Sequence, residues 1–148
     1  MSRLALVLPA ALLLGLTVSA QQPAPSNVQK ATAYSAIPVE AARTPNPVKL
    51  TPESIARAKK WWNLDCAMCH GASGNGKGET AKDMKLTLND LSDPATLKGR
   101  TDGEILYLIK NGFGDMPPEG DRVKGEEAWD LVNYVRSLAK KDTEAKSQ

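Results

Sequence analysis

The segment Cys66-Ala67-Met68-Cys69-His70 holds both cysteines and the single histidine of this 148-residue chain. Two thiols three positions apart, followed at once by an imidazole, form the C-x-x-C-H pattern by which haem is attached to protein. Each thiol can bond to one vinyl group of the porphyrin, and the imidazole then reaches the iron. The pattern therefore predicts one covalent haem c, with Cys66 and Cys69 as thioethers and His70 as the proximal iron ligand.

Three other kinds of site use the same residue types. A thioredoxin-like redox pair needs a strand that leads into the motif, whereas the sequence predicts an amphipathic helix there. A structural zinc site needs four tetrahedral ligands, and a second cluster of cysteines or histidines is missing. A plain disulfide between Cys66 and Cys69 is left open for protein that has never received haem. Haem attachment is the favoured interpretation.

The second axial ligand is predicted by elimination. The chain has no second histidine, and methionine is the other common partner of histidine in electron-carrying haems. Met68 lies inside the attachment motif, and Met84 follows soon after it in a stretch rich in Lys and Asp. Met116 lies far beyond His70 among glycines and prolines, which let backbone pass close to a flat ring and keep the chain extended. We predict Met116 as the distal ligand, in preference to simple packing in the core.

The residues before the motif carry the signals of a helix. Thr51 is a suitable N-cap, and Pro52 favours the first helical position. Apolar residues then recur at helical spacing from Ile55 to Cys66 and share one face. Since no part of the chain alternates like a strand, three further helices complete an all-α prediction, at residues 93–99, 101–112 (with a capping box) and 126–140.

The first twenty residues have the layout of a signal peptide. Arg3 gives a positive start, residues 4–16 are apolar, and Val18-Ser19-Ala20 ends the segment with small side chains. We expect cleavage after Ala20 and export to the periplasm. The alternative is an uncleaved membrane anchor, but a spanning helix needs about 20 apolar residues, and this stretch is shorter and interrupted by Pro9.

Composition divides the remainder of the chain. Residues 21–50 contain five prolines and few large apolar side chains, which favours a flexible spacer. The alternative is that Asn46-Pro47-Val48 lies against the folded part. Residues 51–140 are the predicted domain, and residues 141–148 a disordered tail. The formal net charge of +2 argues against a nucleic-acid binder, which would carry a basic stripe.

Together these features resemble the class I, or mitochondrial-type, monohaem cytochromes c, nearest to the bacterial variants that are free or form small oxidase-associated domains. The resemblance covers roughly residues 52–138, from the first helix through the Met116-Pro117 loop to Leu131-Val132-Asn133-Tyr134-Val135. It implies a small all-α domain whose long loops wrap around one covalent haem.

The resemblance also implies a function. A haem ligated by His70 and Met116 has no open iron position for substrate, so the chain is expected to carry single electrons and not to be an enzyme. The expected partners are redox proteins such as a respiratory oxidase, reductase or dehydrogenase. The chain itself is expected to be a monomer. It should contact membrane only through a partner or an uncleaved anchor. A haem peroxidase would need a distal acid–base residue, and no second histidine is available. A fixed electron-entry subunit of a larger enzyme is left open.

The family pattern further implies that Ala58 and Trp62 of the first helix meet Leu131 and Tyr134 of the last. One departure concerns the proline whose carbonyl usually accepts from the proximal imidazole. This chain has no proline between Gly71 and Asp93. We expect a backbone carbonyl of residues 86–91 to accept instead, because a ligating histidine usually donates its other N–H.

Overall fold

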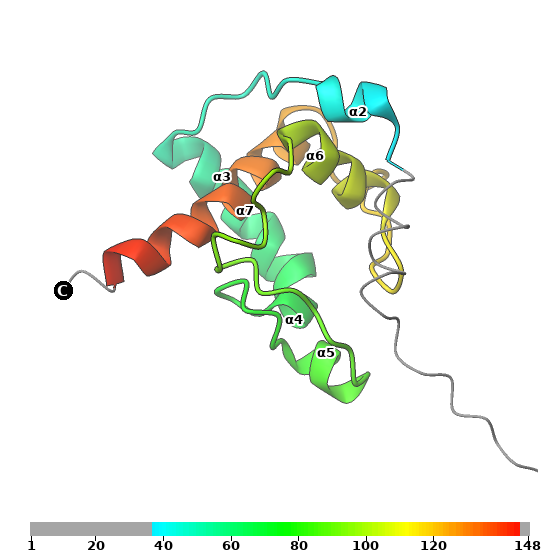
Figure 1. Ribbon diagram of the computed structural model, residues 1–148, viewed down its shortest axis with the longest axis vertical. Helices are drawn as coiled ribbons and strands as arrows, with labels where there is room; N and C mark the ends of the chain where they lie inside the picture. The colour runs from blue at the N-terminus through cyan, green and yellow to red at the C-terminus, as the bar shows by residue number, and fades with distance from the viewer. Residues whose placement is uncertain (1–36, 146–148) are drawn as a thin grey trace, which may run out of the picture.

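The structure, a computed structural model, describes residues 37–145, with side chains as far as residue 139. No strand is present in this range, where Phe113 and Met116 form an isolated bridge, so the predicted all-α class is confirmed. None of the helices in this range is long and apolar enough to cross a membrane. The predicted signal peptide lies outside it. The elements, drawn in Figure 1, are α2 (Val39–Arg43), α3 (Pro52–Trp61), the π-helical turn η1 (Trp62–Cys66), α4 (Ala67–His70), α5 (Glu79–Asp83), α6 (Asp102–Asn111) and α7 (Glu126–Ala145).

The first and last long helices, α3 and α7, cross at the centre of the molecule (Figure 1). Ala58 is fully buried at this crossing, and its small side chain lets the two backbones approach. The rings of Trp62 and Tyr134 pack together with their centroids 5.4 Å apart and tilted by 46°. Such an aromatic pair adds about 1 kcal/mol beyond the burial of its area. The crossing implied by the family resemblance is confirmed.

An ion pair joins the same two helices, and the sequence did not predict it. Asp130 of α7 is fully buried, and both of its carboxylate oxygens accept from the guanidinium of Arg57 in α3. The Nε–Oδ2 and Nη2–Oδ1 distances are 2.6 and 3.0 Å. The forked geometry satisfies a charge that burial would otherwise penalise.

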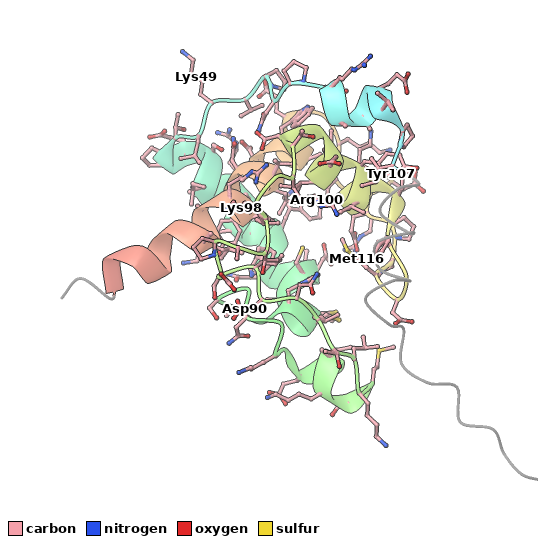
Figure 2. The ribbon with its side chains drawn as sticks, viewed as in Figure 1. Lys49, Asp90, Lys98, Arg100, Tyr107 and Met116 are labelled. Atoms are coloured by element: carbon pink, nitrogen blue, oxygen red, sulfur yellow. The ribbon has the colours of Figure 1, made fainter. Side chains whose placement is uncertain are left out.

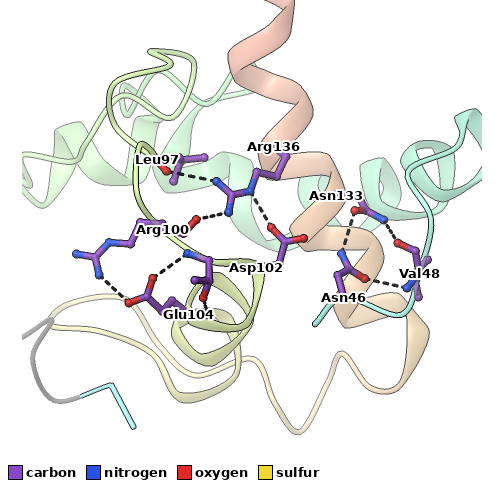
Figure 3. Close-up of polar contacts among 9 residues, drawn as sticks. Asn46, Val48, Leu97, Arg100, Asp102, Glu104, Asn133 and Arg136 are labelled. Atoms are coloured by element: carbon purple, nitrogen blue, oxygen red, sulfur yellow. Dashed lines mark hydrogen bonds and ion pairs between the residues drawn. The ribbon is translucent and has the colours of Figure 1, made fainter. Parts of the chain in front are cut away.

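Helix α6 begins with the predicted capping box. The Thr101 hydroxyl accepts from the Glu104 N–H, and the Glu104 carboxylate accepts from the Thr101 N–H. Arg136 of α7 then fastens this end of α6 (Figure 3). It donates to Asp102 Oδ1 at 2.9 Å and to the carbonyl oxygens of Leu97 and Arg100.

The helix predicted at residues 93–99 is wrong, because this segment is a run of turns. The N–H groups of Thr96 and Lys98 bond to carbonyls three residues back, at 3.0 and 3.3 Å. The carboxylates of Asp90 and Asp93 accept from backbone N–H groups two residues further on. Aspartate side chains that bond locally compete with helix formation.

The segment before α3 packs on the domain, so the flexible spacer is wrong for residues 37–50. Helix α2 lies along α6, and the contact is close at Gly103. A Cβ atom there would lie 1.9 Å from the Ala41 carbonyl oxygen. Residues 21–36 of the predicted spacer lie outside the described range.

Asn133, buried in α7, anchors the end of this segment (Figure 3). Its amide donates to the Val48 carbonyl at 3.1 Å and to Ser54 Oγ at 3.2 Å, and its carbonyl accepts from Asn46 Nδ2 at 3.0 Å. The alternative stated for Asn46-Pro47-Val48 is therefore the one found. The sequence favoured a spacer because Asn133 lies far along the chain from its hydrogen-bond partners. Contacts between such distant positions leave no local sequence pattern.

Two further boundaries differ from prediction. Helix α7 continues beyond residue 140 to Ala145, so the disordered tail is wrong for residues 141–145, which contain no glycine or proline to end a helix. The short helix α5 was not predicted. It begins after Gly78, whose Cβ would lie 2.2 Å from the Met68 carbonyl oxygen, and so packs directly on α4.

Candidate haem-binding site

One continuous helical rod presents the attachment motif. Helix α3 runs through η1, which ends at Cys66, into α4, which carries Cys69 and ends at His70. The rod stops at Gly71, whose φ of +78° is a left-handed conformation that favours glycine. The motif therefore lies at the tip of the rod, directly beyond the α3–α7 crossing.

Both cysteines are free and half-buried. Burial raises the pKa of the Cys66 thiol to about 12, and the nearby charges of Glu119 and Asp65 act in the same direction. A reactive redox cysteine needs a lowered pKa, since the thiolate is the nucleophile. The environment of Cys66 thus disfavours the thioredoxin-like alternative.

The imidazole of His70 is half-buried at the end of α4, with its ring centroid 5.8 Å from that of Trp62. Desolvation lowers its pKa, which favours the neutral form that binds metal. Nδ1 is buried and has no hydrogen-bond partner among the described residues. A half-buried imidazole whose Nδ1 is unpaired, beside two free thiols, fits a haem that takes His70 as a ligand.

The predicted acceptor for His70 is not found in residues 86–91. The carbonyl oxygens of Leu88 and Asn89 lie instead against Gly76, where a Cβ would be 3.0 and 3.1 Å from them. Without the family's proline, this stretch packs on the loop after the motif and leaves Nδ1 unpaired.

Met116 lies on the loop between α6 and α7, in a tight turn. Its N–H donates to the Phe113 carbonyl and its carbonyl accepts from the Phe113 N–H, both at 3.0 Å. Gly112, at φ +75°, allows close packing, since a Cβ there would lie 2.5 Å from the Met116 carbonyl oxygen. The half-buried side chain packs against the core, and Figure 2 shows it pointing from its loop toward the interior.

The other methionines are placed differently. Met84, at the end of α5, is 57% exposed, and Met68, inside the motif, is 54% exposed. Among the described methionines, Met116 alone packs against the apolar core. The apolar side chains that could line a haem pocket include buried Ile105, Ile109 and Val135, core-packed Leu91 and Leu97, and half-buried Leu86, Leu88, Leu108 and Phe113.

A charged cluster beside Cys66 was missed by sequence reasoning. Arg122, from the loop after Met116, donates to Asp65 Oδ1 at 2.7 Å and to Glu119 Oε2 at 3.3 Å. The Glu119–Arg122 spacing is a recognisable local pair. The pairing of Arg122 with Asp65 leaves no signal in the sequence, because it depends on how the loop returns to the motif.

The region that contains the attachment motif is similar to known proteins. Residues 53–135 match the family described as "Cytochrome C oxidase, cbb3-type, subunit III". Cytochrome c6 of Pyropia tenera is 30% identical over 87 residues, which are 59% of this chain and 95% of that protein. Cytochrome c6 of Porphyra purpurea is 31% identical over 87 residues, covering 59% and 74% of the two chains.

A solved structure shares the fold. A chain in the Kuenenia stuttgartiensis reducing HAO-like protein complex is similar, with a TM-score of 0.54 and 26% identity. The similarity covers 62% of this chain but 46% of that one, so this chain spans less than half of its structural neighbour. The shared part supports the helical fold.

Proposed function

Because this chain belongs to the c-type cytochrome family described as cytochrome c oxidase, cbb3-type, subunit III, we propose that it carries single electrons through one haem c ligated by His70 and Met116. The family and the cytochrome c6 relatives support a haem-based electron carrier with covalent haem c. The proposal assigns four residues to that haem. Cys66 and Cys69 hold the haem as thioethers, His70 is the proximal ligand and Met116 the distal ligand.

The bound haem supplies one-electron chemistry, because its iron alternates between two oxidation states. The protein's own residues hold it and set its environment. Burial keeps the His70 imidazole neutral and available. The thioether of Met116 is a soft, uncharged ligand, which favours the reduced state and raises the potential. Ligation by both His70 and Met116 would leave the iron no position for a substrate, so transfer to a partner would be outer-sphere.

The observation that carries this proposal is the placement of Met116. It packs against the apolar core from a loop held by paired backbone hydrogen bonds, whereas Met68 and Met84 are mostly exposed. A half-buried thioether on a loop held by backbone hydrogen bonds is suited to act as an iron ligand.

The substitution Met116→Ala tests the assignment. Haem attachment should survive, because the two cysteines are unchanged. The midpoint potential should fall, the red absorption band of sulfur bonded to ferric iron should vanish, and carbon monoxide should bind the reduced protein freely. Met84→Ala is the matched control and should leave all three properties unchanged. Loss of the band in Met84→Ala, with its retention in Met116→Ala, would assign the other methionine.

The partners we propose are redox proteins in the periplasm, such as a respiratory oxidase, reductase or dehydrogenase. The signal-peptide pattern of residues 1–20 supports export. The mass of the haem-containing protein checks it: a mature chain that starts at Gln21 supports cleavage, and retention of residues 1–20 in the membrane fraction supports the anchor instead.

A further inference from the structure

The loop that carries Met116 is fastened to the haem-attachment turn by a charged bridge. Arg122 follows Met116 on this loop, and Asp65 lies in η1 directly before Cys66. The Arg122 Nη2–Asp65 Oδ1 distance is 2.7 Å. The charges of Asp65, Glu119 and Arg122 all act on the Cys66 thiol, which places the bridge beside the thioether position.

The bridge is partly shielded from water. The side chain of Asp65 is 12% exposed, and that of Arg122 is 51% exposed. The second carboxylate oxygen of Asp65 is buried without a hydrogen-bond partner among the described residues. Arg122 therefore compensates a carboxylate that has lost much of its hydration, which makes the pair more specific than one between two exposed chains.

The rest of the loop is fixed on the α6 side. The N–H groups of Glu119 and Gly120 donate to the carbonyls of Ile109 and Lys110, at 2.9 and 3.1 Å. Val123 is buried just beyond. These contacts hold the loop to α6 but not to the attachment turn. Arg122, which lies between Gly120 and Val123 in the sequence, supplies that second connection.

We propose that the Arg122–Asp65 bridge sets how firmly Met116 is held at the haem. Cys66 and Cys69 would hold the porphyrin, and His70 the iron, at the attachment turn. Met116 belongs to a separate loop. Release of Met116 is a local opening of that loop, and contacts that join the loop to the turn raise the free energy of opening. Asp65 and Arg122 are thus positioning residues, and this inference rests on the proposed ligation by Met116.

The test compares Arg122→Gln with Asp65→Asn in the holo-protein, and measures the rate at which carbon monoxide binds the reduced form. Both substitutions should raise this rate by about threefold, as expected for the loss of a half-exposed ion pair. Both should also weaken the red iron–sulfur band at alkaline pH earlier than in the unsubstituted protein. Arg122→Lys, which keeps the charge and one bond, should recover part of the loss.

Opposite charges make the design decisive. If the two residues acted only through their fields on the haem, removing a cation and removing an anion would shift the rate in opposite directions, and the double variant would return to the starting value. A bridge predicts shifts in the same direction and a double variant no worse than either single one. Glu79→Gln and Lys82→Gln are the control, since they break an exposed pair, 2.6 Å long, that lies within α5 alone.

Failure of this inference is distinct from failure of the ligand assignment. Unchanged rates in Arg122→Gln and Asp65→Asn, with the band still lost in Met116→Ala, overturn the bridge and leave the ligand in place. Free carbon monoxide binding by the unsubstituted protein overturns the ligand itself.

Discussion

Asp130 shows at the level of one residue how burial and charge combine in this chain. It is fully buried in α7, and the guanidinium of Arg57 donates to both of its oxygens. Aspartate is almost never fully buried unless paired. From the sequence, this carboxylate belongs to the polar side of an amphipathic helix, and only the crossing of α3 with α7 brings its partner to it.

Asp130→Asn should lower the denaturation midpoint markedly. The amide keeps the shape of the side chain but turns one acceptor into a donor that faces the guanidinium, so a buried polar group loses its partner. Urea unfolding of the holo-protein checks this. Glu127→Gln removes the same charge from an exposed position in the same helix and should change the midpoint little. Equal midpoints for the two variants would mean that the buried pair contributes no stability.

The attachment residues behave differently from Asp130. Cys66, Cys69 and His70 were predicted from spacing alone, because the chemistry that joins them acts over adjacent positions of one helix. The thiols are free, whereas Nδ1 of His70 lacks, among the described residues, the backbone acceptor expected for it. The roles assigned to them remain proposals for the experiments above.

At the level of the helices, the clearest difference from prediction is α2. The prolines favoured a flexible spacer there, but α2 packs against α6. Helix α2 has no buried residue of its own, so its apolar pattern is too weak to predict packing. It is held where Gly103 leaves room for the Ala41 carbonyl. The chain continues to the Asn133 amide, which fixes Asn46 and Val48.

The effect of Gly103→Ala on the free energy of unfolding should depend on whether α2 is present. In the full chain the added methyl would meet the Ala41 carbonyl, and overpacking of this kind costs about 1–3 kcal/mol. In a chain that starts at Leu50 the clash is absent. The same substitution should then be neutral or stabilise α6 by up to about 1 kcal/mol, since alanine is the better helix former. Identical effects in both chains, measured by urea unfolding, would show that α2 does not pack there in solution.

At the scale of the whole molecule, charge is nearly balanced. The formal net charge is +2, and many charged groups are used in internal pairs such as Arg57–Asp130 and Arg136–Asp102. Lys77, Lys82 and Lys85 are exposed around α5, where Lys82 pairs with Glu79. The molecule therefore offers only a weak field to a distant partner.

We expect electron exchange with a partner to depend only mildly on salt. Raising the ionic strength from about 0.01 to 0.15 M shortens the Debye length from about 30 to 8 Å, and the association rate constant should change by less than about tenfold. Stopped-flow measurement across this range checks the expectation. A fall of several decades, reversed by neutralising Lys77, Lys82 and Lys85, would show that this local patch steers the encounter.

Features that depend on local interactions could be predicted from the amino-acid sequence. The attachment motif, the capping box at Thr101 and the amphipathic helices depend on residues within a turn or two of each other. Spacing and side-chain chemistry are therefore sufficient to predict them.

Contacts between residues far apart in the sequence were visible only in the tertiary structure. The bridge from Arg122 to Asp65, the anchoring of residues 37–50 on Asn133, and the orphan Nδ1 of His70 all depend on where loops return in space. Residues 93–99 form turns instead of the predicted helix, and within them the Asp93 carboxylate accepts from the Ala95 N–H. Polar contacts between distant residues depend on which groups are buried next to each other in the folded chain. They follow no periodic pattern of residues, so the sequence does not predict them.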